Sequence, residues 1–183
     1  YHGLSHELPV GIEKTKIKTV VTIHDLIFLR FPNLFTKIDR KIYEKKFRYA
    51  CESSDKIVAV SNQTKKDIIN FFDVEEKKIE VIYQGCNKVF KSKRKSSEIS
   101  EVKNKFNLFE NYLLYVGSIE ERKNLITLLH SLKDLQNKNL IIIGDGKNYK
   151  EKCIEYIKNN NLSKRVKILS DLNLYEISCI YQK

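Results

Sequence analysis

The sequence predicts an α/β protein built from two successive units, each with a parallel sheet covered by helices. Short runs rich in Val, Ile and Leu alternate with longer segments of helical periodicity, and a polar, basic stretch divides this alternation into two series. The expected strands are 18–24, 56–60 and 78–83 in the first series, and 111–117, 139–144 and 165–169 in the second. Such alternation is typical of parallel sheets whose faces are covered by crossover helices.

Helices are expected between the strands of the first series. Residues 36–54 follow a helical rhythm, with Ile38, Ile42 and Tyr49 on one face and six basic residues around the rest. Ser61 is a suitable N-cap for the helix that follows the second strand. We therefore expect the order strand, helix, strand, helix, strand in this half.

The second series repeats this order. A leucine stripe predicts an amphipathic helix after its first strand, formed by Leu125, Leu128, Leu129, Leu132 and Leu135. A helix carrying Cys153, Ile154 and Ile157 is expected next, and a short helix from about Leu172 follows the last strand.

The polar stretch between the series sets the expected domain boundaries. The segment "QGCNKVFKSKRKSSEIS" (84–100) has the composition of a linker. We expect residues 1–90 to be the C-terminal part of a first domain, 91–108 an interdomain linker, and 109–183 the first part of a second domain. Two Rossmann-like units joined in this way predict a ligand cleft between them, at the carboxyl ends of the strands. The chain has no methionine, even at position 1, which we interpret as a sign of an internal fragment.

Composition narrows the class of protein. The 183 residues are 42% hydrophobic and 31% charged, and no apolar run approaches the roughly 20 residues that a membrane helix needs. We therefore expect a cytoplasmic protein. The four cysteines are scattered without metal-ligand spacing, so no metal site is expected.

The net charge of +11 favours an anionic partner, which means nucleic acid, a membrane surface or a phosphorylated substrate. The alternative is a lysine-rich composition that only solvates the surface. A nucleic-acid-binding protein is disfavoured because the basic residues are spread along the chain and no known nucleic-acid-binding motif is present.

The segment "YVGSIEERKNLITLLHSL" (115–132) carries the most informative charges. Gly117 permits a tight turn after its strand, and Arg122 and Lys123 follow where a helix is expected to begin. Cations at a helix N-terminus are unfavourable unless an anion binds there, which indicates a phosphate or diphosphate site. The alternative is a solvated cation pair offset by Glu120 and Glu121.

Two further strand ends are candidates. His24 and Asp25 directly follow the strand at 18–24, where an imidazole can donate to a sugar hydroxyl or a phosphate. Gly144 and Gly146 bracket a turn into a helix and would suit a nucleotide. Each has a plain structural alternative, namely a loop histidine and an ordinary strand-to-helix turn.

Taken in order, the motifs resemble the retaining glycosyltransferases of family 4, which have the GT-B fold of two Rossmann-like domains. The matching segments are "HGLSHELP" (2–9), "TIHDLIFLRFP" (22–32), "SDKIVAVSNQTKKDI" (54–68), "KIEVIYQGCN" (78–87), "YVGSIEERKNL" (115–125) and "LIIIGDGKNY" (140–149). They span nearly the whole chain with family-like spacing. Glu121, where much of the family has proline, and "YQGCN" are departures from the pattern.

The resemblance implies a role for each candidate residue. Arg122 and Lys123 would neutralise the donor diphosphate, and His24 would lie near the transferred sugar; we expect these three residues to be catalytic. We also expect Arg122 and Lys123 to bind the donor, together with Gly117, Ser118, Gly144 and Gly146. The family's glycine-rich loop and its E-x7-E segment are expected outside this chain, so the fragment alone is expected to be inactive.

The implied reaction transfers a hexose, with mannose favoured, from a GDP- or UDP-linked donor to a glycan or lipid-linked acceptor in cell-surface polysaccharide synthesis. Retention at the anomeric carbon is expected, without a metal or another cofactor. Another GT-B sugar-nucleotide enzyme such as an epimerase, and an inactive truncated remnant, are the alternatives. The basic helix at 36–54 also suggests, as a hypothesis, peripheral contact with anionic lipid at the inner face of the plasma membrane.

Overall fold

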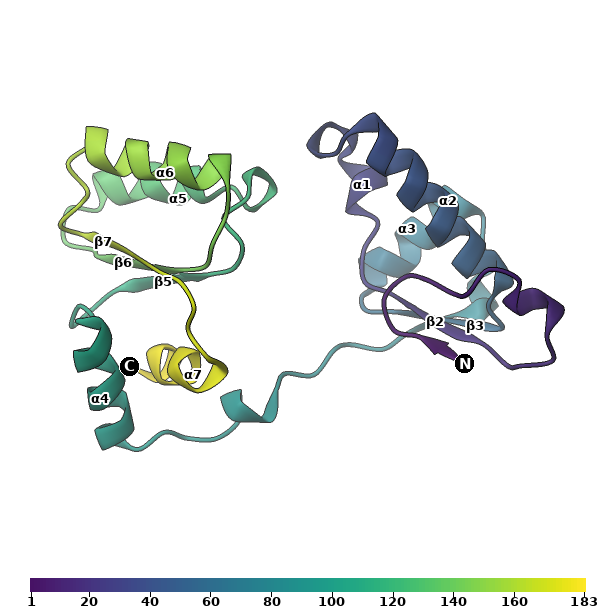
Figure 1. Cartoon of the computed structure of the whole chain (residues 1–183), viewed down its shortest axis with the longest axis horizontal. Coiled ribbons are helices and arrows are strands. Elements are labelled where there is room, and N and C mark those ends of the chain that lie inside the picture. The colour runs from purple at the N-terminus through teal and green to yellow at the C-terminus, as the bar shows by residue number, and fades with distance from the viewer. The chain divides into compact units, whose positions relative to one another are not determined.

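The computed structural model describes all residues, Tyr1 to Lys183, and divides into two compact units (Figure 1). The first unit is Tyr1–Gly85 and the second is Cys86–Lys183. Each has its own parallel sheet, as the alternation of strands and helices predicts, with one apolar core in the first unit and two in the second.

The first unit contains a parallel sheet of four strands in the order β1-β2-β3-β4. Its strands are β1 (His2–Gly3), β2 (Val20–Ile23), β3 (Lys56–Ala59) and β4 (Ile79–Val81), and its helices are α1 (Ile27–Arg30), α2 (Lys37–Ser53) and α3 (Asn62–Phe72). The expected strands and the two longer helices are confirmed. The Ser61 hydroxyl accepts the Thr64 amide at 3.0 Å, which confirms the predicted N-cap of α3.

Helix α2 corrects one expectation about its buried face. Ile38 is 72% exposed and Ile42 is 47% exposed, although both were expected on the apolar face of the helix. The residues that enter the core are Phe47, Ala50 and Cys51. The sequence analysis assigned the buried face of α2 from its large aliphatic side chains. Close packing against the sheet instead buries the face that carries the small residues Ala50 and Cys51.

The second unit contains a parallel sheet of three strands in the order β5-β6-β7. Its strands are β5 (Leu113–Val116), β6 (Leu140–Ile143) and β7 (Val166–Leu169), and its helices are α4 (Ser96–Phe106), α5 (Leu125–Asp134), α6 (Asn148–Asn159) and α7 (Leu174–Gln182). Helices α5 and α6 lie on one face of this sheet, and α4 and α7 lie on the other (Figure 1).

The central strand β6 explains why this sheet is covered on both faces. All four of its residues, "LIII", are buried. Leu140 and Ile142 join the core under α5 and α6, while Ile141 and Ile143 join the core under α4 and α7. Successive strand residues point to opposite faces, so a fully aliphatic strand needs helices on both sides. The leucine stripe of α5 supplies Leu125, Leu129 and Leu132 to the first of these cores.

The expected linker at 91–108 is different in the structure. This segment contains helix α4, whose Val102 is only 4% exposed and which packs against α7. Arg94, just before α4, also contacts α7, because its Nε donates to the Ser178 hydroxyl at 2.9 Å. The segment is polar in composition, but Ile99, Val102 and Phe106 form an apolar helical face that packs into the core. So few apolar residues did not indicate a buried helix.

The remaining sequence expectations concern cysteines and membrane helices. The four thiols are free, and burial raises the pKa of Cys51 to about 12, which keeps it protonated and unreactive. None of the helices is both long and apolar enough to span a bilayer.

Candidate functional site

The two loops at the carboxyl ends of β5 and β6 are held together through their backbones. The Gly117 amide donates to the Ile143 carbonyl at 2.9 Å, and the Ile119 amide donates to the Asp145 carbonyl at 2.8 Å. The loops therefore continue the pairing of the strands beyond the sheet. This contact brings the predicted Gly117 and Ser118 beside the predicted turn at 144–146.

Glycine is required where these loops touch. A Cβ atom on Gly144 would lie 2.0 Å from the Gly117 carbonyl oxygen, and one on Gly146 would lie 2.2 Å from the Ile119 carbonyl oxygen. Neither position has room for any side chain. The "GDGKNY" segment therefore serves close backbone packing between the loops, whatever else it binds.

Arg122 and Lys123 lie in a single 3₁₀ turn (Glu121–Lys123) directly before α5. Helix α5 begins two residues later than expected, at Leu125, because Asn124 adopts a left-handed conformation with φ 51°. The pair is therefore displayed on the turn that leads into the helix. Lys123 is exposed and has no ion-pair partner, whereas Arg122 donates from Nε to Glu120 at 2.7 Å.

The amino end of α5 is partly capped from α6. The Tyr149 hydroxyl accepts the Ile126 amide at 3.1 Å, and the Asn124 carbonyl accepts the Thr127 amide at 3.2 Å. The helix thus offers fewer unpaired amides than the sequence suggests, and the two cations become the main anion-attracting groups of this turn.

Two carboxylates lie at these loops with lowered pKa values. Hydrogen bonding from Ser118, and then the Arg122 guanidinium, hold the pKa of Glu120 below its usual range. Lys150 and the Gly146 amide do the same for the pKa of Asp145, whose Oδ1 accepts from Lys150 Nζ at 2.6 Å and from the Gly146 amide at 2.8 Å. Both carboxylates are therefore ionised at neutral pH.

In the first unit, His24 lies just beyond the carboxyl end of β2, as predicted. Its Nε2 lies 3.0 Å from the Leu4 carbonyl oxygen, and its own carbonyl accepts from the Thr64 hydroxyl at 3.0 Å. The neighbouring Asp25 has a different role, because its carboxylate accepts the Ile27 amide at 3.2 Å and so supports the start of α1. The histidine is thus held by a loop carbonyl.

His6 is a second imidazole at this edge that the sequence analysis did not identify. Its Nδ1 accepts the His24 backbone amide at 3.3 Å, and the two rings lie edge to face with centroids 5.0 Å apart. The other side of the ring stacks on Phe47 of α2 at 4.4 Å. Only the second histidine of "HGLSHELP" hints at it, because the packing partners come from distant parts of the chain.

The surroundings of His6 keep its ring neutral. Burial, and then repulsion from His24, lower the pKa of His6, and they outweigh the attraction of Asp25 and Glu7. Because Nδ1 accepts a hydrogen bond, the proton of the neutral ring is on Nε2. His6 also has a left-handed backbone, with φ 64°.

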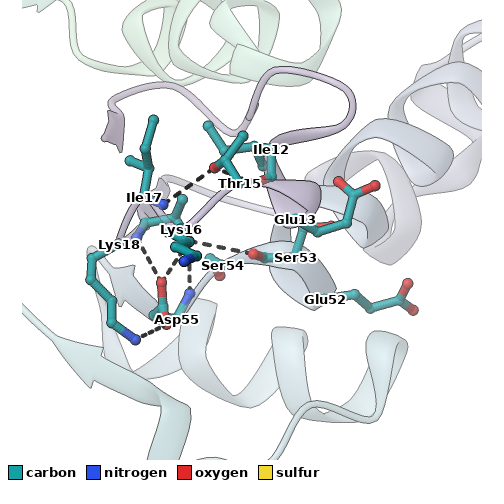
Figure 2. Close-up of a pocket in the computed structure, with 11 residues that line it drawn as sticks. Ile12, Glu13, Thr15, Lys16, Ile17, Lys18, Glu52, Ser53, Ser54 and Asp55 are labelled. Atoms are coloured by element: carbon teal, nitrogen blue, oxygen red, sulfur yellow. Dashed lines mark hydrogen bonds and ion pairs between the residues drawn. The ribbon is translucent and has the colours of Figure 1, made fainter.

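A separate cavity of about 290 Å³ opens at the amino ends of β2 and β3 (Figure 2). Its most connected side chain is Asp55, which accepts from the Thr19 amide at 2.7 Å and from Lys18 Nζ at 3.0 Å. These bonds lower the pKa of Asp55 to about 2. The polar groups of Asp55 thus hold together the two loops that lead into β2 and β3. The cavity lies at the amino ends of the strands, and His24 lies at their carboxyl ends.

Comparison with known proteins confirms the family that the motifs suggest. Residues 2–88 match the family model described as Glycosyltransferase Family 4, and residues 96–183 match the model described as Glycosyl transferases group 1. Together the two models cover nearly the whole chain.

Curated relatives include two O-antigen enzymes. The O-antigen chain mannosyltransferase RfbU of Salmonella typhimurium is 27% identical over 183 aligned residues, which cover 97% of this chain and 45% of the relative. The O-antigen chain mannosyltransferase B of Escherichia coli is 29% identical over 132 residues, or 72% of this chain and 33% of the relative. The chain therefore spans less than half the length of these relatives.

Solved structures agree on the fold. A glycosyltransferase from Rickettsia africae ESF-5 superposes with a TM-score of 0.72 at 19% identity, over 98% of this chain and 49% of that one. Anabaena Alr3699/HepE in complex with UDP-glucose superposes with a TM-score of 0.72 at 19% identity, over 89% of this chain and 44% of that one. The two family matches and this shared fold show that the chain belongs to the GT-B glycosyltransferases of family 4 and group 1.

Proposed function

We propose that this chain carries part of the donor site of an enzyme that transfers a hexose from a nucleotide sugar to a glycan or lipid-linked acceptor, with retention. The observation that carries the proposal is the turn before α5, which carries Arg122 and Lys123. It follows the loop of Ser118, which packs closely against the backbone of Gly144 and Gly146. Two adjacent cations on a short turn suit a group that gains negative charge as it departs.

The chemistry follows from where that charge develops. As the bond between the sugar and the diphosphate breaks, the leaving oxygen becomes more negative, and cations held near it favour the transition state over the bound substrate. Arg122 would supply directional donors and Lys123 a point charge. The proposal uses these cations in place of a metal ion, and no D-x-D sequence is present to hold one.

Mannose is the proposed sugar, and GDP or UDP the proposed nucleotide. Support for mannose comes from the names of the two O-antigen relatives, both of which are mannosyltransferases. Support for a nucleotide-sugar donor comes from the Anabaena structure, which was solved with UDP-glucose. His24 is the proposed contact to the transferred sugar, because its imidazole lies at a strand end with only one hydrogen bond to the protein.

Titration with UDP and GDP tests the donor site. We expect the double variant Arg122→Ala, Lys123→Ala to bind more weakly by at least about 100-fold, because two charge-assisted hydrogen bonds of about 1.5–3 kcal/mol each are lost. The matched control is Lys133→Ala, Lys138→Ala, which removes two exposed lysines at the other end of α5 and before β6. Equal affinities of the double variant and the control would overturn the proposal.

A second assay separates transfer from epimerisation. The enzyme that carries this chain is incubated with GDP- and UDP-hexoses, with and without a glycan acceptor, and the products are analysed by mass spectrometry and by NMR of the anomeric proton. A retaining transferase forms a product only when the acceptor is present and keeps the anomeric configuration of the donor. Conversion of the donor sugar without an acceptor would favour an epimerase.

We also propose that the outer face of α2 contacts anionic lipid. Ile38 and Ile42 are exposed one turn apart, and exposed Lys37, Lys41 and Lys45 surround them without ion-pair partners. Apolar residues bordered by lysines suit insertion at a lipid headgroup layer, where each basic residue contributes about 1 kcal/mol.

Vesicle flotation tests the lipid contact. We expect Ile38→Ser, Ile42→Ser to release the protein from anionic vesicles, and neutral vesicles to bind it poorly. The control Ile17→Ser, Ile82→Ser changes two other apolar residues of the same unit, which are 55% and 49% exposed. Equal binding to neutral and anionic vesicles, or equal release by both pairs of substitutions, would contradict the contact.

A further inference from the structure

We propose that Glu120 is the internal counter-anion of the diphosphate site. It holds Arg122 while the site is empty, gives way when a nucleotide diphosphate binds, and pairs with Arg122 again when the nucleotide leaves. This inference rests on the proposed function, because it assigns a competitor to the same cation that would bind the donor phosphates.

The pairing geometry supports this role. Arg122 Nε lies 2.7 Å from a Glu120 carboxylate oxygen, and the two residues are separated by only one position in the chain. The Arg122 side chain is 34% exposed and the Glu120 side chain 47% exposed, so the pair faces solvent and an incoming anion can reach it. An exposed pair of this kind is weak enough to be exchanged for another anion.

The loop keeps the carboxylate charged and close to both cations. Hydrogen bonding from Ser118 lowers the pKa of Glu120, and Ser118 belongs to the loop that Gly144 and Gly146 hold in place. Glu120 also starts the 3₁₀ turn, because its carbonyl accepts the Lys123 amide at 2.9 Å. The carboxylate is therefore attached to the same turn that carries both cations.

The adjacent carboxylate behaves differently. Glu121 is exposed and has no ion-pair partner, although its charge and its side chain are the same as those of Glu120. Lys123 also has no partner. The loop thus neutralises one cation and leaves the other free, so that Lys123 can attract an anion before Arg122 exchanges its carboxylate for a phosphate.

The neighbouring loop contains a similar pair. Asp145 receives the Lys150 ammonium group at 2.6 Å and the Gly146 amide at 2.8 Å, just where α6 begins. Both helix starts at this edge of the sheet therefore carry a carboxylate from their own loop. Such carboxylates satisfy local donors in the empty protein and lower the affinity for any outside anion.

A functional consequence follows for product release. An internal carboxylate that competes for Arg122 weakens binding of the nucleotide diphosphate and shortens its residence. Removal of that carboxylate leaves the guanidinium without a competitor. The variant therefore binds the product more tightly and releases it more slowly.

The test compares Glu120→Gln with Glu121→Gln by calorimetric titration with UDP and GDP in 0.15 M salt. We expect Glu120→Gln to bind about two- to fivefold more tightly, as an exposed ion pair predicts. We expect the dissociation rate in stopped-flow experiments to fall by the same factor. Glu121→Gln, which removes the same charge, should stay within about 1.5-fold because screening weakens its unpaired charge.

A second variant protects the test against a folding defect. Glu120→Asp keeps the charge but shortens the side chain, so it cannot reach Arg122 as well, and we expect it to tighten binding as Glu120→Gln does. If Glu120 only stabilised the loop, both variants would lower the melting temperature and weaken binding.

The outcomes separate this inference from the proposed function. If Arg122→Ala, Lys123→Ala binds UDP and GDP as tightly as the unmodified protein, the donor site itself is misassigned. If that variant loses binding while Glu120→Gln and Glu121→Gln behave alike, the donor site stands and only the role of Glu120 is overturned.

Discussion

The carboxyl edges of the two sheets are built by different means. At the edge of the second sheet, backbone meets backbone, and Gly144 and Gly146 leave no space for side chains between the loops. At the edge of the first sheet, side chains fill the space: His6 stacks on Phe47 and accepts the amide of His24. One edge is charged and open to solvent, whereas the other carries a neutral, partly buried ring.

This difference decides how each edge responds to substitution. Backbone contacts depend on the absence of a side chain, so any added atom disrupts them. Aromatic packing depends on shape and contact area, so it is destabilised mainly by the removal of atoms. Substitutions at each edge test this contrast.

Phe47→Ala is expected to destabilise the first unit by about 3–4 kcal/mol, because Phe47 is only 8% exposed and its removal leaves a cavity beneath His6. Urea unfolding followed by circular dichroism measures the change. The control Phe71→Ala removes a phenylalanine that is 37% exposed and should cost much less. Equal costs would show that the first edge does not depend on this ring.

Gly144→Ala is expected to destabilise the second unit by about 2–3 kcal/mol, because the new methyl group would lie 2.0 Å from the Gly117 carbonyl oxygen. Urea unfolding measures this cost as well. Gly85→Ala is the matched control, since a Cβ there has no neighbour within 4 Å. A neutral result for Gly144→Ala would mean that the two loops separate at little cost.

His6→Asn should remove a pH dependence from the first unit. The lowered pKa of His6 means that the unfolded chain takes up a proton first, so stability falls as pH drops below 6.5, the usual pKa of histidine, and levels off below the folded pKa. Asparagine tolerates the left-handed backbone, and its oxygen can accept the His24 amide. Thermal melts from pH 7.5 to 5 should show a flatter curve for the variant, and an unchanged slope would contradict this assignment.

Asp55→Asn should have the smallest effect, and it concerns the opposite edge of the first sheet. The pKa of Asp55 is lowered to about 2 from its usual value of 3.8, so its stabilisation is present above pH 3.8 and is lost as pH falls towards 2. The variant should therefore lose less stability in this window than the unmodified protein does. Acid titration followed by circular dichroism checks this, and parallel curves would exclude the contribution.

The sequence predicted most of the sheet but only part of the helix packing. Runs such as "LIII" of β6 identify strands because their aliphatic residues are adjacent in the chain. Helix α4 was expected to be a linker, since its three core residues are scattered among charged ones. The buried face of α2 was predicted from the size of its aliphatic residues, whereas packing against the sheet determines which residues are buried.

The two candidate edges differed in the same way. The sequence placed its candidates Gly117, Arg122, Lys123, Gly144 and Gly146 correctly next to strand ends, because each falls in a short segment where local pattern and local structure coincide. Their role in binding stays a prediction. His6 was missed, because its partners His24 and Phe47 are distant in the chain and only folding brings the three together. Glu120 was noted as a neighbouring charge, but its bond to Arg122 depends on the 3₁₀ turn.

The hydroxyl of Tyr149 has a mechanical consequence for the second unit. Tyr149 lies in the first turn of α6, and its hydroxyl accepts the Ile126 amide in the first turn of α5. The two helices are therefore joined near their amino ends. A pull on one helix is therefore transmitted directly to the other. If the proposed diphosphate binds at this edge, it meets two helix starts that this hydrogen bond has already brought together.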